Sequence, residues 1–150
     1  MTTGTPMTPP EQNELLGEIT TLLVDHLPEG WRRLVMDYLV VGRHVNVAAG
    51  VRMADGSTRR WSPPKESARL FSSLRSGMYV EGRGTWYSLE LIVDPPATYS
   101  VRYNWDDEPG FRSAPDPEHF RLDQERFPRD EENMPAWFRD RLATAPPAAN

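Results

Sequence analysis

An alternating stretch followed by a tight turn limits the fold more than any other feature of this sequence. Along residues 45–53, valine, alanine and methionine alternate with small or polar residues, which is the period of a strand with one buried face. Asp55-Gly56 follows, and both residue types accept the positive φ that a two-residue hairpin turn requires. Residues 58–61 then form the returning strand. With the Leu-, Val- and Tyr-rich residues 31–41 before them, these segments predict a three-strand antiparallel meander.

A second pair of alternating stretches predicts a β-hairpin later in the chain. Residues 85–93 and residues 99–105 both place aromatic or aliphatic side chains at every other position. Asp94-Pro95-Pro96 between them breaks the alternation, so this hairpin has a longer loop. A sheet of about five strands is therefore expected, three in the meander and two in the hairpin.

Helical patterns precede and separate these strands. Thr8-Pro9-Pro10-Glu11 combines a side-chain cap, a proline at the first helical position and a glutamate at the third, which is typical of a helix start. Apolar residues recur at intervals of three and four through residues 9–27 and again through residues 63–79. Two shorter C-terminal helices are expected near residues 117–125 and 130–143. This order predicts an α+β fold, with an antiparallel sheet and helices on one face.

Length and composition favour one globular domain. The 150 residues are 38% apolar and include five Trp, five Tyr and five Phe, so the chain can bury a core and is too aromatic to be disordered. There is no Cys, which excludes disulfides and thiolate catalysis. No apolar run approaches the ~20 residues of a membrane span, and the N-terminus lacks a signal-peptide pattern. We therefore expect a soluble cytoplasmic protein, with one domain over residues 9–143 and flexible segments at residues 1–8 and 144–150.

Charge is distributed unevenly along the chain. Seventeen basic and 22 acidic residues give a formal net charge of −5, which argues against broad binding to a nucleic-acid backbone. Residues 51–100 contain seven basic and five acidic residues, whereas residues 106–132 contain ten acidic and four basic ones. Two acidic runs contribute to this excess, Asp106-Asp107-Glu108 and Asp130-Glu131-Glu132. The C-terminal half would therefore attract a basic partner.

Recognisable catalytic patterns are absent from the sequence. His26, His44 and His119 lie in no metal-binding spacing and beside no obvious nucleophile, and the HExxH, GxSxG and GxxxxGK motifs do not occur. Residues 106–108 form the one cluster that could hold a divalent ion for hydrolysis, but consecutive side chains at a strand end point in different directions. We therefore expect no catalytic residue, no metal and no cofactor, with a metal-dependent hydrolase at residues 106–108 as the alternative.

The second acidic run has a structural interpretation. Asp130 is suited to cap the last helix, and Glu131 and Glu132 would lie favourably at its positive end. Cross-strand packing would likewise explain the aromatic residues of the hairpin, but aromatic side chains beside carboxylates on an open sheet face would make a protein-binding patch. The residues expected at such a partner interface are Trp86, Tyr103, Trp105, Asp106, Asp107, Glu108, Phe111, Asp130, Glu131 and Glu132.

Several specific motifs lie between residues 84 and 138. They comprise Trp86 and Ser88 on a strand, the corner Tyr103-Asn104-Trp105-Asp106-Asp107-Glu108-Pro109, the triplet Phe127-Pro128-Arg129, and Pro135 with Trp137. In these motifs the chain resembles the YezG-like family of bacterial immunity proteins, which are antitoxins encoded beside secreted polymorphic toxins. The N-terminal half agrees with the family in its order of elements.

The resemblance implies a non-enzymatic protein that inhibits by binding. In that family the immunity protein holds a toxin domain, most often a nuclease, and so protects the producing cell. A nuclease presents a basic groove, which an acidic surface can occupy with fast, salt-sensitive association. Both acidic runs are therefore expected to face the toxin. Two other possibilities stay open: a different kind of toxin, such as an NAD-degrading enzyme, or a structural adaptor that binds no toxin.

Overall fold

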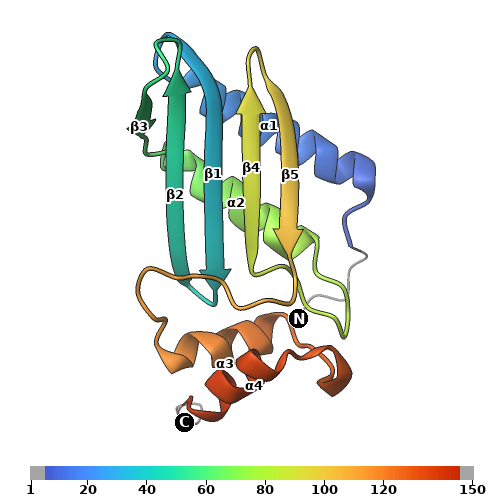
Figure 1. The fold of residues 1–150 in the computed structure, drawn as a ribbon. Helices are drawn as coiled ribbons and strands as arrows, with labels where there is room; N and C mark the ends of the chain where they lie inside the picture. Colours follow the sequence, from blue (N-terminus) through green and yellow to red (C-terminus); the bar gives the residue numbers. More distant parts are fainter. Residues whose placement is uncertain (1–5, 146–150) are drawn as a thin grey trace.

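The predicted meander and hairpin join in one antiparallel sheet with the strand order β3-β2-β1-β4-β5 (Figure 1). This computed structural model describes residues 6–145. Its strands are β1 (Trp31–Val41), β2 (His44–Met53), β3 (Thr58–Arg60), β4 (Ser88–Asp94) and β5 (Thr98–Asn104). The α+β class and the sheet of five strands are confirmed over this part of the chain. The strand order, which the sequence left open, places β1 at the centre, paired with β2 and β4.

Four α-helices and one 3₁₀ turn complete residues 6–145: α1 (Pro9–Asp25), α2 (Glu66–Gly77), α3 (Pro117–Arg126), η1 (Glu131–Asn133) and α4 (Ala136–Ala143). The start of α1 confirms the expected capping box. The Glu11 N–H donates to Thr8 Oγ1 at 3.3 Å, and the Thr8 N–H donates to the Glu11 carboxylate at 2.9 Å. The second helix begins at Glu66, later than the predicted start at residue 63. Pro63 precedes Pro64, and a residue before proline is disfavoured from the helical region.

The expected helix over residues 130–143 is divided in two. Pro135 takes the N-cap position of α4, and Met134 before it is extended, so α4 begins only at Ala136. The prediction that Asp130 caps the last helix is therefore wrong. Asp130 precedes η1, and its side chain makes no capping hydrogen bond. Consequently Glu131 and Glu132 lie in η1, outside the first turn of α4.

Helices α1 and α2 cover one face of the sheet, whereas α3 and α4 lie at one end of it (Figure 1). The main core lies between the sheet and α1 and α2, and includes Ile19, Leu23, Leu34, Met36, Phe71, Leu74, Trp86 and Leu91. A second cluster, Val41, Tyr87, Phe120 and Phe138, joins the sheet to α3 and α4. Within residues 6–145, no helix covers the opposite face of the sheet, which we call the open face.

A buried ion pair fixes α3 to the rest of the domain. The Arg75 guanidinium on α2 contacts both carboxylate oxygens of Asp123 on α3, at 2.6 and 3.1 Å. Asp123 also accepts the Gly42 N–H from the β1–β2 turn at 3.0 Å. Gly42 has a φ of +56°, and a Cβ there would lie 2.5 Å from the His119 carbonyl oxygen, so this turn requires glycine.

Two further expectations concern flexible segments at the ends of the chain and a membrane span. Of the segments expected to be flexible, residues 1–5 and 146–150 lie outside the described residues. Met7 is anchored, because its N–H donates to the Gly77 carbonyl at 2.7 Å. No helix within residues 6–145 combines the length and apolarity needed to cross a bilayer.

Candidate protein-binding surface

Asn104, the last residue of β5, organises the acidic turn formed by residues 105–108. Its side-chain oxygen accepts the N–H groups of Asp106 and Asp107, at 3.3 and 2.9 Å. Its amide nitrogen donates to the Asp107 carbonyl at 2.8 Å and to Ser88 Oγ at 3.1 Å. An asparagine that bonds the backbone two and three residues later fixes a turn locally. The side chain of Asn104, which directly precedes the acidic turn, therefore holds the backbone of this turn in place.

Arg129 holds the same turn from the interior of the protein. Its side chain is only 3% exposed. Nη2 donates to the carbonyl oxygens of Trp105 at 2.7 Å and Thr85 at 2.8 Å. The guanidinium lies 4.4 Å from the centre of the Tyr87 ring, where a cation–π contact compensates part of its desolvation. Arg129 therefore connects the Phe-Pro-Arg motif to the acidic turn.

The last helix supplies two further contacts to the turn. Trp137 Nε1 donates to the Asp106 carbonyl at 2.7 Å, and Arg141 Nη2 binds the Glu108 carboxylate at 2.9 Å. Backbone groups receive most of these bonds, so the Asp106 side chain stays 77% exposed, with its carboxylate 3.7 Å from Arg129 Nη1. Motifs that are distant in the sequence thus meet at one acidic turn.

The predicted interface aromatics have packing roles. Trp86 is fully buried in the main core and offers no surface to a partner. Tyr103 and Trp105 are half-buried against the same core. Alternation along β5 directs Tyr103 to the helix-covered face, whereas Trp105 follows the end of β5, one residue short of the predicted strand. Phe111 packs on the second cluster, with its ring 5.3 Å from the His44 ring.

The predicted carboxylates are all exposed, and they lie on two separate turns. Asp106, Asp107 and Glu108 follow β5. The other run consists of Asp130, Glu131 and Glu132, and these residues line a shallow surface hollow of about 450 Å³. Arg129 links the two turns, because it contacts Trp105 and Asp106 in one turn and directly precedes Asp130 in the other.

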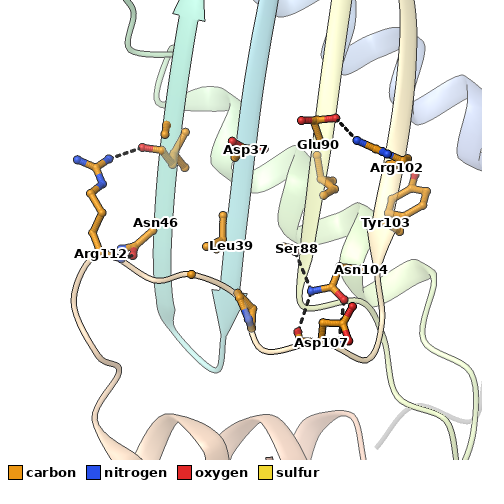
Figure 2. Close-up of a pocket in the computed structure, with 15 residues that line it drawn as sticks. Asp37, Leu39, Asn46, Ser88, Glu90, Arg102, Tyr103, Asn104, Asp107 and Arg112 are labelled. Atoms are coloured by element: carbon orange, nitrogen blue, oxygen red, sulfur yellow. Dashed lines mark hydrogen bonds and ion pairs between the residues drawn. The ribbon is translucent and has the colours of Figure 1, made fainter. Parts of the chain in front are cut away.

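The open face of the sheet carries a groove that the sequence did not predict (Figure 2). It has a volume of about 650 Å³, with a floor from β1, β2, β4 and β5 and one wall from residues 107–112. Arg112 fastens this wall to β2: its N–H donates to Asn46 Oδ1 and its Nη2 to the Val47 carbonyl, both at 2.8 Å. Asp107 lines the groove as well, so the groove and the acidic turn are continuous.

Two carboxylates face each other at the floor of this groove. The strand register places Asp37 on β1 directly opposite Glu90 on β4, and Glu90 opposite Arg102 on β5 (Figure 2). Arg102 binds Glu90 at 2.9 Å, but the Arg102 side chain is 84% exposed, so water weakens this pair. Burial raises the pKa of the Asp37 carboxyl, and the negative charge of Glu90 raises it further.

Replacement of Asp37 by asparagine is expected to stabilise the free protein slightly. The raised pKa means that ionised Asp37 destabilises the folded state, fully at neutral pH and progressively less as the pH falls through the raised pKa towards 3.8. Water screens this half-buried group, so the gain should stay below about 1 kcal/mol. Urea denaturation at neutral pH and at about pH 4 would measure it. Glu18→Gln, an exposed change on α1, is the matched control, and equal curves for Asp37→Asn and wild type at neutral pH would contradict the prediction.

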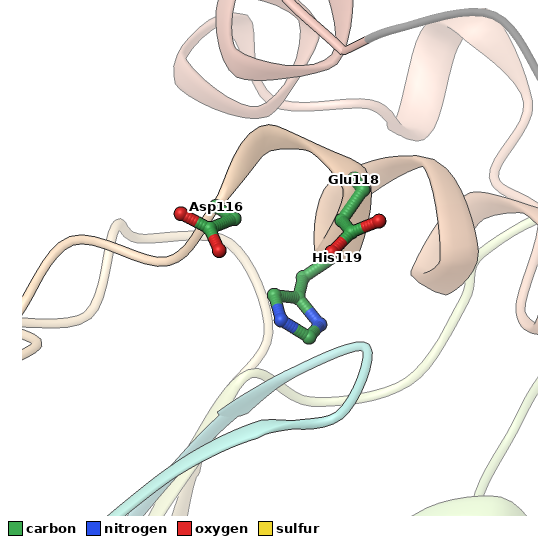
Figure 3. Close-up of side chains that lie close together, drawn as sticks. All are labelled: Asp116, Glu118 and His119. Carbon is green, nitrogen blue, oxygen red and sulfur yellow. The ribbon is translucent and has the colours of Figure 1, made fainter.

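One group of side chains has a metal-like geometry, and it is not the predicted one. Asp116, Glu118 and His119 place potential ligand atoms within 4.8 Å of one another, and no other such group occurs in residues 6–145 (Figure 3). Both carboxylates are exposed, and His119 Nδ1 already accepts the Arg43 N–H at 3.2 Å. The carboxylates of residues 106–108 do not converge in this way, so the geometry gives no support to a hydrolase there.

Comparison with models of known protein families gives no match, and comparison with curated proteins gives none either. The resemblance to the immunity-protein family therefore stays a prediction that rests on the motifs themselves.

Proposed function

We propose that this chain is an immunity protein that binds a cognate secreted toxin domain and inhibits it stoichiometrically, without catalysing a reaction. The observation that carries the proposal is the construction of the acidic turn. Asn104 and Arg129 fix its backbone, while the carboxylates of Asp106 and Asp107 stay in water. A preorganised charged turn loses little conformational entropy when it binds, so its charge can serve association with a basic partner.

A nuclease is the toxin class that this surface fits best. Nucleases hold a polyanionic substrate in a basic groove, and an acidic surface with the opposite field accelerates encounter with that groove. The two acidic turns at the α3–α4 end and the net charge of −5 both favour such a partner. An NAD-degrading toxin is the alternative, and it would have to present a basic patch of its own to use the same surface.

The acidic turn is expected to control the rate of association with the toxin. Replacing Asp106, Asp107 and Glu108 together by alanine should slow association by about tenfold or more at low salt, because the steering charge is lost. The measurement is association kinetics with the toxin domain encoded by the neighbouring gene, at low and at physiological ionic strength. Inhibition of that domain by the wild-type chain is measured in parallel.

The matched control removes three acidic side chains from the helix-covered side of the molecule. Glu14, Glu18 and Asp25 are exposed on α1, so their replacement by alanine changes the net charge equally without touching the acidic turn. If the turn variant and the control variant associate with the toxin at the same rate, the acidic turn does not face the toxin.

A further inference from the structure

The strand register arranges the open face in rows that cross four strands. The central row runs Ala48, Asp37, Glu90, Arg102 from β2 to β5. The rows on either side are Gly50, Val35, Ile92, Ser100 and Asn46, Leu39, Ser88, Asn104. On β2 the small residues Ala48 and Gly50 therefore occupy the central row and one neighbouring row. The aliphatic side chains of Val35, Leu39 and Ile92 lie in the rows beside the two carboxylates. Val35 is 36% exposed, one of the largest exposures among the hydrophobic residues.

Asp37 is a half-buried charge of this groove that has no ionic partner among the described residues. Within residues 6–145 it takes part in no ion pair. Arg102 binds Glu90, and the Arg112 Nη2 is directed to the Val47 carbonyl. Like charges directly opposite on adjacent strands destabilise a sheet, so the free protein carries an electrostatic cost at this position. A cation from outside the chain would remove that cost.

We infer that the groove on the open face receives an arginine side chain of the toxin, bound between the carboxylates of Asp37 and Glu90. This inference rests on the proposed function and adds a second contact region to the acidic turn. The evidence is charge complementarity on an uncovered face: an unpaired carboxylate beside a weakly paired one, in a groove of about 650 Å³.

The geometry favours arginine over lysine. Directly opposite residues on antiparallel strands have Cβ atoms about 4.5–5.5 Å apart, so the carboxylates of Asp37 and Glu90 can receive the two sides of one planar guanidinium. The aliphatic stem of an arginine would pack against Val35 or Leu39. An ammonium group is a compact point charge and bridges two acceptors less well.

Continuity with the acidic turn supports the same partner for both regions. Asp107 lines the groove and also belongs to the turn, so one basic surface can cover the two together. The acidic turn would govern the encounter, because it is exposed. The half-buried pair would govern dissociation, because charges that are desolvated on binding contribute mainly to the lifetime of a complex.

The first test needs no toxin. Isotope-labelled wild-type protein and Asp37→Asn are titrated with N-acetylarginine amide while backbone amide shifts are followed by NMR. We expect shifts centred on Asp37, Leu39 and Glu90, an affinity about threefold or more lower for Asp37→Asn, and weaker binding of N-acetyllysine amide. Shifts confined to residues 106–108 and 130–132, or equal affinities for both proteins, would overturn the inference.

The second test uses the neighbouring toxin domain. Asp37→Asn should bind it about tenfold or more weakly, mainly through faster dissociation, whereas Glu18→Gln on α1 should bind like the wild type. If the wild-type chain inhibits the toxin and Asp37→Asn retains full affinity, the inference fails and the proposed function stands. If the wild-type chain does not bind the toxin at all, the proposed function fails, and the arginine titration alone decides whether the groove accepts a guanidinium.

Discussion

Replacement of Asp123 by alanine is expected to lower the free energy of unfolding by about 3–5 kcal/mol, because it leaves one member of a buried ion pair uncompensated. Asp123 is 4% exposed and binds the Arg75 guanidinium through both oxygens. Without it, Arg75 keeps its Nε bond to the Trp86 carbonyl but has no counter-ion. The Gly42 N–H loses its acceptor as well, so the β1–β2 turn, α2 and α3 are all affected.

Urea denaturation followed by tryptophan fluorescence would measure this loss. Asp140→Ala, an exposed change on α4, should stay within about 0.5 kcal/mol of the wild type. The double variant Arg75→Met with Asp123→Leu should recover much of the stability, since replacing both ions by apolar groups removes the unpaired charge. A loss below about 1 kcal/mol for Asp123→Ala would show that water reaches Arg75 and that the pair does not hold α3 on the domain.

The parts of the fold that depend on local chemistry could be predicted from the sequence. Thr8 and Glu11 are three residues apart and cap α1 as expected. The Asp55-Gly56 turn forms in part as expected: Gly56 adopts a φ of +86°, but Asp55 does not have a positive φ and instead accepts the Ser57 N–H at 2.8 Å. Residues 54–57 separate β2 from β3, so the expected two-residue turn is wrong. The last helix shows the limit of such reasoning, since the acidic residues 130–132 suggested its capped start, whereas Pro135 determined where α4 begins.

The strand order could not be predicted, because it depends on which segments pair over long distances. The groove follows from that order. Alternation marks Asp37 as outward-facing between Met36 and Tyr38, but its position opposite Glu90 exists only because β4 lies beside β1. The pattern of polar residues along β4 does not by itself predict a groove. Charge counting therefore found the exposed acidic runs and missed the half-buried pair.

The positions of the aromatic residues were open for the same reason. Tyr103 and Trp105 follow the alternation expected of a strand, but the sequence does not say which face of that strand meets the helices, and β5 ends at Asn104, before Trp105. The motif residues turned out to hold the acidic turn in place: Asn104 does so locally, and Arg129 from 24 residues away through its bond to the Trp105 carbonyl. Only the local one of these two contacts is accessible to sequence reasoning.

Replacement of Arg129 by alanine is expected to destabilise the protein by about 2–4 kcal/mol and to loosen the acidic turn. The buried guanidinium satisfies the carbonyl oxygens of Thr85 and Trp105, and truncation leaves both without this donor. The cation–π contact with Tyr87 is lost at the same time. Arg129→Lys should recover only part of the loss, since an ammonium cannot reproduce the planar fork that reaches these acceptors.

Hydrogen exchange separates the local effect of Arg129→Ala from the global one. The amides of Asp106 and Asp107 are bonded to Asn104, and their exchange should become about tenfold or more faster than the global loss of stability requires. Arg126→Ala, an exposed change at the end of α3, should leave these amides unchanged. If the turn keeps its protection in Arg129→Ala, then the contacts of Asn104, Trp137 and Arg141 fix the turn without Arg129. In that case toxin association should also survive the substitution, because steering depends on where the carboxylates of the turn are held and not on the buried arginine itself.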